Sequence, residues 1–295
     1  MPARRGLAIF VLVTVALTPI ALASPQKVAS PQTDDLSISI ERILNLARID
    51  APPVGTGLQI HADFPATAPL WLGDTKIRSL TAEITPAGIP RVVNVVTSEA
   101  RSQRRGPRGR VAECEDAHYA ASGPAWAGYE MPITWYFNLN SVPDYLSDRG
   151  TLQAIRRGHR AWPRELTNCS RVGNNFHYRY AGDTDRGVDF DGQNTIDFAQ
   201  LGRPLAVNYL WYSTESILEV DLRFNPKYRW TNTDGSRNAY HVINVATHEL
   251  GHQLGLDDLG RAHATLTMFG QIGLGEVNKV TLGTGDLVGA SQVSP

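Results

Sequence analysis

Hydrophobic and polar residues alternate in short runs along this chain, and their spacing predicts an ordered series of strands and helices. The clearest run, residues 217–224, has apolar residues at every second position from Leu218 to Phe224 with charged residues between them, as in a strand with one buried face. Comparable runs predict strands at residues 132–138, 176–180, 195–199 and 206–212. Apolar residues at helical spacing predict a helix from about Thr151 to Leu166, which Pro163 should kink or end early. This order indicates an α/β fold.

The first hundred residues show a different pattern. Helical spacing at residues 36–47 is followed by alternating runs at 77–84 and 92–96, which predict strands. Residues 24–100 carry no recognisable motif, so a propeptide, a β-rich accessory domain and an adhesion module all remain open. Residues 101–110 contain five arginines, two glycines and one proline, which predicts an exposed linker. Processing there by a protease that prefers basic residues and an unprocessed solvated loop are equally compatible with this composition.

The chain begins like an exported protein. Residues 1–23 combine two early arginines, an apolar stretch and a small-residue ending at Ala23, which predicts a secretory signal peptide. An uncleaved anchor is the alternative, but Pro19 interrupts the apolar stretch, which is short for a span of about 20 residues. We expect a secreted, extracellular protein that has no membrane contact after signal cleavage.

The composition limits the binding partners that the protein can have and predicts the oxidation state of its two cysteines. A formal net charge of −1 and a pI near 6.7 give no electrostatic case for binding nucleic acid. With 42% hydrophobic residues, the chain can bury one good core and a smaller second unit, and we expect a monomer. The two cysteines, Cys114 and Cys169, predict one disulfide, because exported compartments permit disulfides and no third cysteine competes.

The most informative run is HELGHQLGLDD at residues 248–258. His248 and His252 are four residues apart and fall on one face of a helix, as two ligands of one zinc ion require. Glu249 points about 100° away from them, within reach of a metal-bound water, and is the candidate general base. Gly255 should end the helix and turn the chain so that Asp258 becomes the third ligand.

Two further metal assignments are open at this stage. His263 competes with Asp258 as third ligand, although the turn after Gly255 favours Asp258. An aspartate ligand should weaken the Lewis acidity of the zinc. Residues 183–192 hold four aspartates, which makes calcium a second candidate cofactor, but their spacing does not fit an EF-hand and surface loops are commonly this acidic.

The motif H-E-x-x-H-x-x-G-x-x-D, with Met268 ten residues further on, resembles that of the metzincin zinc metallopeptidases. Residues 247–257 are similar to the matrixin branch, and the tail at 270–290 is similar to secreted bacterial matrixin-like proteins. Residues 267–270 resemble the Met-turn, in which the methionine packs beneath the metal. Aspartate as the third ligand resembles the snapalysin-like proteases instead.

The resemblance implies an α/β (α+β) catalytic domain over residues 111–295. Its expected parts are a mixed, mostly parallel five-stranded twisted sheet with an antiparallel edge strand, a long zinc-binding helix and a Met-turn, beside a smaller and possibly β-rich unit at 24–100. By the same resemblance, residues 206–212 form the edge that binds an extended peptide in antiparallel orientation.

Many matrixins are held latent by a propeptide cysteine that binds the zinc. Cys114 precedes the catalytic region as such a cysteine would, but its context, VAECED at residues 111–116, does not match the pattern of that switch. Acidic neighbours would also raise the pKa of the thiol and weaken it as a ligand. The disulfide with Cys169 is therefore the preferred interpretation.

Together these features predict a secreted zinc-dependent endopeptidase acting on proteins or peptides through a zinc-activated water, with Glu249 as general base. Two other functions remain open. One is a zinc-bearing binding module without catalytic activity. Proteins that lose activity in this way usually lose the glutamate first, and Glu249 is present here. The other is a zinc hydrolase that does not act on peptides, which a closed pocket in place of a long groove would indicate.

Overall fold

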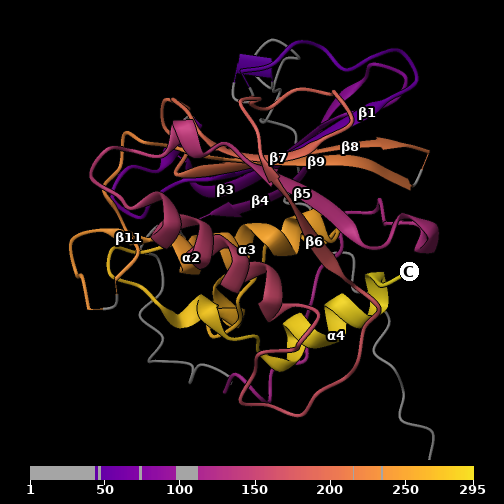
Figure 1. Cartoon of the computed structure of the whole chain (residues 1–295). Coiled ribbons are helices and arrows are strands. Elements are labelled where there is room, and N and C mark those ends of the chain that lie inside the picture. Colours follow the sequence, from indigo (N-terminus) through magenta and orange to yellow (C-terminus); the bar gives the residue numbers. More distant parts are fainter. Residues whose placement is uncertain (1–43, 46–47, 73–74, 98–111, 215, 234) are drawn as a thin grey trace, which may run out of the picture.

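The computed structural model describes residues 44–45, 48–72, 75–97, 112–214, 216–233 and 235–295 (Figure 1). The predicted signal peptide, most of the predicted helix at 36–47 and the arginine-rich linker lie outside the described residues. Within the described part of the chain, no helix is long and apolar enough to cross a membrane.

Nine strands form one sheet, in the order β2-β3-β1-β8-β9-β7-β5-β6, with β4 paired to β3 (Figure 1). Their bounds are β1 Gly57–Asp63, β2 Leu70–Leu72, β3 Thr75–Ile84, β4 Pro90–Thr97, β5 Ile133–Phe137, β6 Tyr178–Asp183, β7 Asn194–Phe198, β8 Ala206–Ser213 and β9 Ser216–Phe224. Two short strands, β10 Trp230–Thr231 and β11 Tyr240–His241, pair separately. The sheet therefore joins elements from both halves of the chain.

The sheet is larger than the five strands expected from the sequence. Strands β5, β6, β7 and β9 pair in parallel, and β8 runs antiparallel to β9. The other edge of β8 pairs with β1, which continues the sheet into β3, β2 and β4. An edge strand offers a row of unsatisfied N–H and C=O groups, and β1 satisfies those of β8. Residues 111–295 contribute five of these strands, β5 to β9, but β8 is not the edge strand that the resemblance implied, because β1 pairs with it.

Three helices lie on the same side of the sheet (Figure 1). They are α2 Asp148–Ala161, α3 Val242–Gln253 and α4 Thr284–Val293, and four short 3-10 turns lie at Gly128–Glu130, Leu139–Ser141, Arg261–His263 and Asn278–Val280. The Ser147 side chain caps α2 by accepting a hydrogen bond from Gly150 N. The helix ends at Ala161, two residues before Pro163, as the sequence predicted.

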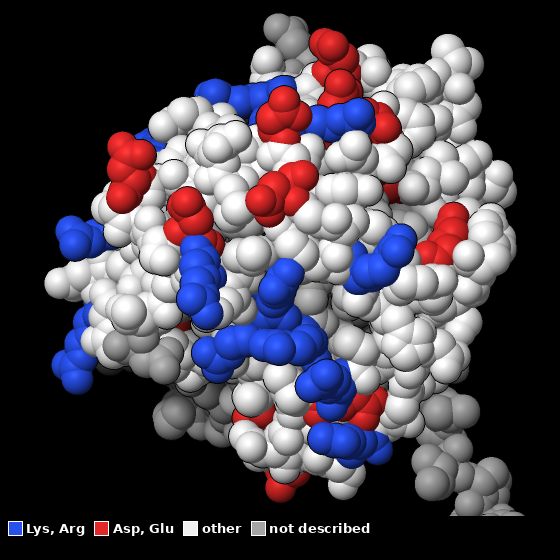
Figure 2. Space-filling view, in the orientation of Figure 1, with Lys and Arg blue, Asp and Glu red and all other residues white. Residues whose placement is uncertain are grey.

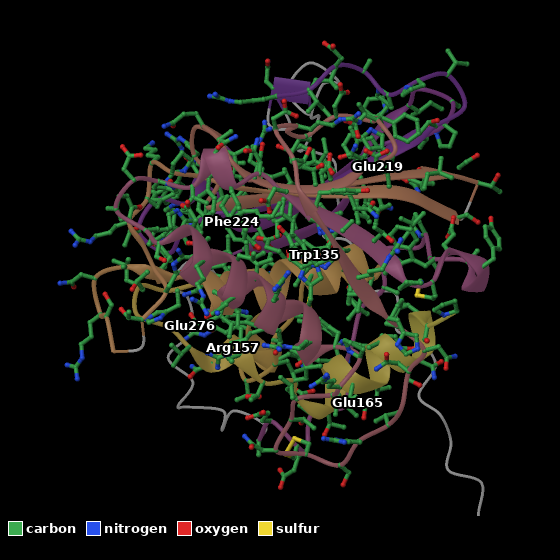
Figure 3. The ribbon with its side chains drawn as sticks, in the orientation of Figure 1. Trp135, Arg157, Glu165, Glu219, Phe224 and Glu276 are labelled. Carbon is green, nitrogen blue, oxygen red and sulfur yellow. A yellow bond between two sulfur atoms is a disulfide. The ribbon has the colours of Figure 1, made fainter. Side chains whose placement is uncertain are left out.

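The side of β5 that faces α2 is aromatic. Trp135 points toward the helix, where its ring stacks on His159 at 4.0 Å between centroids (Figure 3). The opposite, solvent-facing side of α2 is basic, and Lys and Arg side chains gather over it in Figure 2. This helix carries exposed arginines at positions 156, 157 and 160. Helix α2 thus separates an aromatic core layer from a solvated, positively charged surface.

The alternation in β9 was interpreted wrongly in one respect. Glu219 and Asp221, predicted to face solvent, are buried, whereas Leu218 is 41% exposed. Glu219 lies on the sheet side away from the helices (Figure 3), and both carboxylates accept hydrogen bonds from backbone N–H groups of residues 189–195. Because this loop covers them, burial raises the pKa of Glu219 to about 7.

The disulfide between Cys114 and Cys169 is present and joins residues 55 positions apart. We expect the double variant Cys114→Ala/Cys169→Ala to lose about 4 kcal/mol of unfolding free energy, because the crosslink restricts the unfolded chain. Urea denaturation of both proteins followed by tryptophan fluorescence measures the loss. Equal denaturation midpoints for the two proteins would contradict this role.

Candidate metal centre

Helix α3 and the turn after it bring the three predicted ligands together. The Nε2 atom of His248 lies 3.3 Å from Oδ1 of Asp258, and Nε2 of His252 lies 3.7 Å from the same oxygen. A fourth residue that the sequence analysis missed, Asp63 at the end of β1, places Oδ2 2.9 Å from Nε2 of His248. Each of the four residues offers one ligand atom, and these four atoms all lie within 4.8 Å of one another. We call this group the His2Asp2 cluster.

The His2Asp2 cluster fits a tetrahedral zinc ion. Zinc bonds of about 2.0–2.1 Å imply separations of about 3.3 Å between ligand atoms, and three of the separations here are 2.9, 3.3 and 3.7 Å. Among the residues that the structure describes, these ligand atoms are buried, and apart from one another they interact only with the neighbouring carboxyl group of Glu249. Unpaired buried polar atoms are costly, and a cation would satisfy all of them at once.

Backbone contacts orient the two imidazoles. Nδ1 of His248 contacts the carbonyl oxygen of Thr267 at 2.6 Å, and Nδ1 of His252 contacts that of Leu256 at 2.9 Å. A carbonyl oxygen can only accept, so each Nδ1 carries the proton and each Nε2 presents its lone pair to the cluster. Both rings are therefore fixed in the tautomer that binds a metal.

The turn that delivers Asp258 depends on Gly255. Its φ of +96° is a left-handed conformation, which side chains disfavour, and an added Cβ would lie 2.6 Å from the carbonyl oxygen of Pro124. Helix α3 ends at Gln253, so the chain reverses at Gly255 as expected from the sequence. Ser122 N then donates to Gly255 O, and Asp257 N to Ala120 O, which fix the turn.

All twelve residues of helix α3 are buried, so the helix is covered on every side. Its histidine face is covered by the N-terminal strands, whose contribution the helical pattern could not reveal. His61 from β1, which had no assigned role, stacks on His252 with ring centroids 4.4 Å apart. Burial and the neighbouring His252 lower the pKa of His61, so its ring is neutral.

Glu249 lies inside this buried region, and its carboxyl oxygens have no hydrogen-bond partner outside the cluster among the described residues. Burial, and next the carboxylate of Asp63, raise the pKa of Glu249 well above its usual range. Asn208 on β8 donates to the carbonyl oxygen of Glu249 at 2.8 Å, which ties this helix turn to the sheet. The predicted base therefore lies beside the ligands.

Met268 packs beneath the helix. Gly251, between the two histidines, has no side chain, and an added Cβ there would lie 2.2 Å from Sδ of Met268. Two residues missed by the sequence analysis hold this segment in place. Asp286 of α4 accepts hydrogen bonds from the N–H groups of Thr267 and Met268, and Nζ of Lys279 donates to the Thr267 carbonyl oxygen.

His263, the competing third ligand, lies elsewhere. Its Nδ1 contacts Asp116 Oδ2 at 2.9 Å and its ring stacks on His118 at 4.0 Å. The structure thus brings Asp258, and not His263, to the histidine pair. The acidic loop at 183–192 forms no group with metal-ligand spacing among the described residues, and calcium there stays a prediction.

Two imidazoles one helical turn apart, a carboxylate and an adjacent glutamate define the class of mononuclear zinc hydrolases. The model of the family described as Matrixin matches residues 125–293, more than half of the chain, and the chain belongs to the matrixin family. It therefore carries a zinc metallopeptidase-type domain. No curated protein gives a match to the chain. The family match begins after β4, so the N-terminal strands lie outside it.

We expect His252→Ala to lose most zinc binding, because three ligands cannot replace the missing imidazole. His177→Ala is the matched control, since His177 is exposed and outside the cluster. Calorimetric titration with zinc measures both affinities. Wild-type affinity in His252→Ala would exclude this site.

We expect Gly255→Ala to lower unfolding free energy by about 1–3 kcal/mol through backbone strain, and to weaken zinc binding by displacing Asp258. Gly260→Ala serves as control, because no atom lies within 4 Å of a Cβ added there. Thermal unfolding with and without zinc tests both effects. Equal behaviour of the two variants would remove Gly255 from the account of the site.

Proposed function

We propose that this protein is a secreted zinc endopeptidase in which His248, His252 and Asp258 hold the metal and Glu249 is the general base. The observation that carries the proposal is the convergence of two correctly oriented imidazoles and a carboxylate beside a buried glutamate. Membership of the matrixin family supports peptide bonds as the target. The signal-like residues 1–23 and the disulfide support export.

The chemistry divides between the metal and the protein. Bound zinc supplies Lewis acidity, which polarises the scissile carbonyl and acidifies water. Glu249 accepts the proton of the attacking water and passes it to the leaving amine. Glu249 is fully buried beside the proposed ligands, so no bulk water competes for its carboxylate. Thr267 and Leu256 keep the two imidazoles in the required tautomer throughout.

The substrate would bind as an extended strand. By the family resemblance, the peptide would add through main-chain hydrogen bonds along the side of β8 that β1 occupies in this structure. Recognition through the backbone suits an endopeptidase, since it requires neither end of the substrate. A zinc-bearing module without turnover is disfavoured, because it has no need of Glu249, and nothing specific favours a hydrolase that acts on other bonds.

We expect Glu249→Gln to lower peptidase activity by roughly 10²–10⁴-fold while zinc stoichiometry stays unchanged, because the amide cannot accept the proton. Hydrolysis of an unfolded protein is measured before and after limited trypsin digestion, which can cleave at the arginines of residues 101–110. Glu115→Gln, at an exposed position, is the control, and each sample is also assayed with a chelator. Activity that survives in Glu249→Gln would rule out this mechanism.

A further inference from the structure

We propose that the outer edge of β6 and the arginine-rich face of α2 together bind an extended acidic segment of another polypeptide. No residue of the His2Asp2 cluster takes part, so the inference goes beyond the proposed function and does not depend on hydrolysis. In a peptidase, such a surface would hold an acidic region of the substrate away from the bond that is cleaved. An unpaired strand edge and a set of unpaired cations carry the proposal.

Strand β6 lies at one end of the sheet and pairs only with β5 among the described residues. Toward β5, Ile133 N donates to the carbonyl oxygen of His177 at 2.8 Å. Successive residues of a strand in a parallel pair direct their N–H and C=O groups to opposite sides. The main-chain groups of Tyr178 and Tyr180 therefore point outward, and no described residue forms a hydrogen bond with them. A free edge of this kind can accept one further strand.

The solvent-facing side of α2 carries a row of positive charges, which we call the arginine stripe: Arg149, Arg156, Arg157, Arg160 and, just after the helix, Arg164. The four on the helix fall within an arc of about 100°, so they share one face. All five are exposed, and Lys and Arg side chains gather over α2 in Figure 2. None of them forms an ion pair with a carboxylate of the described residues. The stripe therefore lacks a partner of opposite charge.

Arg156 brings the arginine stripe to the edge of β6. Its Cζ lies 4.3 Å from the centroid of the Tyr180 ring, and that ring also contacts Trp135 on β5. Arg179, the next residue toward the start of β6, is exposed on the other face of the strand, because neighbouring side chains alternate. Its Nη2 donates to Thr134 Oγ1 at 3.1 Å, which leaves its charge unpaired. Cations therefore flank the free edge on both faces of the sheet.

This arrangement selects an acidic strand. A segment added along β6 would turn alternate side chains toward α2, where Arg156 and Arg160 lie one helical turn apart, and the others toward Arg179. Guanidinium groups bind carboxylates through paired hydrogen bonds, whereas a lysine-rich segment would meet like charges. Asp183 and Asp185 are exposed where β6 ends, so the acidic side chains should lie along the first half of the strand.

The test uses the full-length chain and a short fluorescent peptide in which glutamate alternates with valine. We expect this peptide to bind, and the same peptide with lysine in place of glutamate not to bind. A third peptide, with glutamates kept and backbone amide nitrogens methylated, cannot donate to a strand edge and should bind at least about tenfold more weakly. Fluorescence anisotropy measures the affinities, and mass spectrometry checks that the peptides stay intact.

Variants of the arginine stripe test the contribution of charge. Arg156→Gln/Arg160→Gln should weaken binding of the acidic peptide at least about tenfold, because two charge-assisted contacts are lost. Arg156→Lys/Arg160→Lys keeps both charges without the planar fork, and its affinity should lie between those of the wild type and the glutamine variant. Arg237→Gln, at an exposed position away from α2 and β6, should bind like the wild type. Circular dichroism checks that each variant is folded.

Three outcomes would overturn the proposal. The first is equal affinity of the wild type and a folded Arg156→Gln/Arg160→Gln for the acidic peptide. The second is equal affinity for the methylated peptide, which would reduce the surface to a basic patch without strand pairing. The third is binding to vesicles of phosphatidylserine and phosphatidylcholine without binding to the peptide, which would assign the arginine stripe to a membrane surface.

Discussion

The structure depends on a group of buried polar atoms that a shared cation would satisfy. Two imidazole nitrogens and two carboxylates lie together out of contact with solvent, with Glu249 beside them. Much of the surrounding architecture serves to hold these atoms in position. Carbonyl oxygens fix the imidazole tautomers, the glycine turn after α3 returns Asp258, and Asp286 and Lys279 hold the segment beneath the helix. Rigid support of this kind is what a metal site needs to select geometry and chemistry.

The strands and helices in the second half of the chain could be predicted from the sequence, because the spacing of apolar and polar residues indicates each of them. Alternation located β5, β7, β8 and β9 to within a few residues, and Pro163 correctly marked the end of α2. The histidine spacing and Gly255 located the zinc helix and its reversal. The predicted exposure of two side chains was wrong. Glu219 and Asp221 look exposed in sequence because nothing local shows that the loop at 189–195 folds over them.

Strand β1 was missed for a related reason. Its sequence, GLQIHAD, mixes apolar and polar residues, yet all seven are buried, because His61 stacks on His252 and Asp63 lies against His248 instead of facing water. One of its two partner strands, β8, begins more than 140 residues later, so no local signal connects β1 with β8. The same distance hides Asp286 and Lys279, whose roles arise from contacts with the segment around Met268. Long-range pairing decides these features, and a single sequence does not display it.

The pairing of β1 with β8 also bears on how this protein avoids self-association. Strand β8 is eight residues long and almost wholly buried, with large apolar side chains such as Leu210 and Trp211. Without β1 it would present a long, uncharged edge, which is a template for joining strands of other molecules. Because residues 57–63 emerge first during synthesis, they are available when β8 appears. The N-terminal strands therefore remove from the surface an edge that could otherwise pair with strands of other molecules.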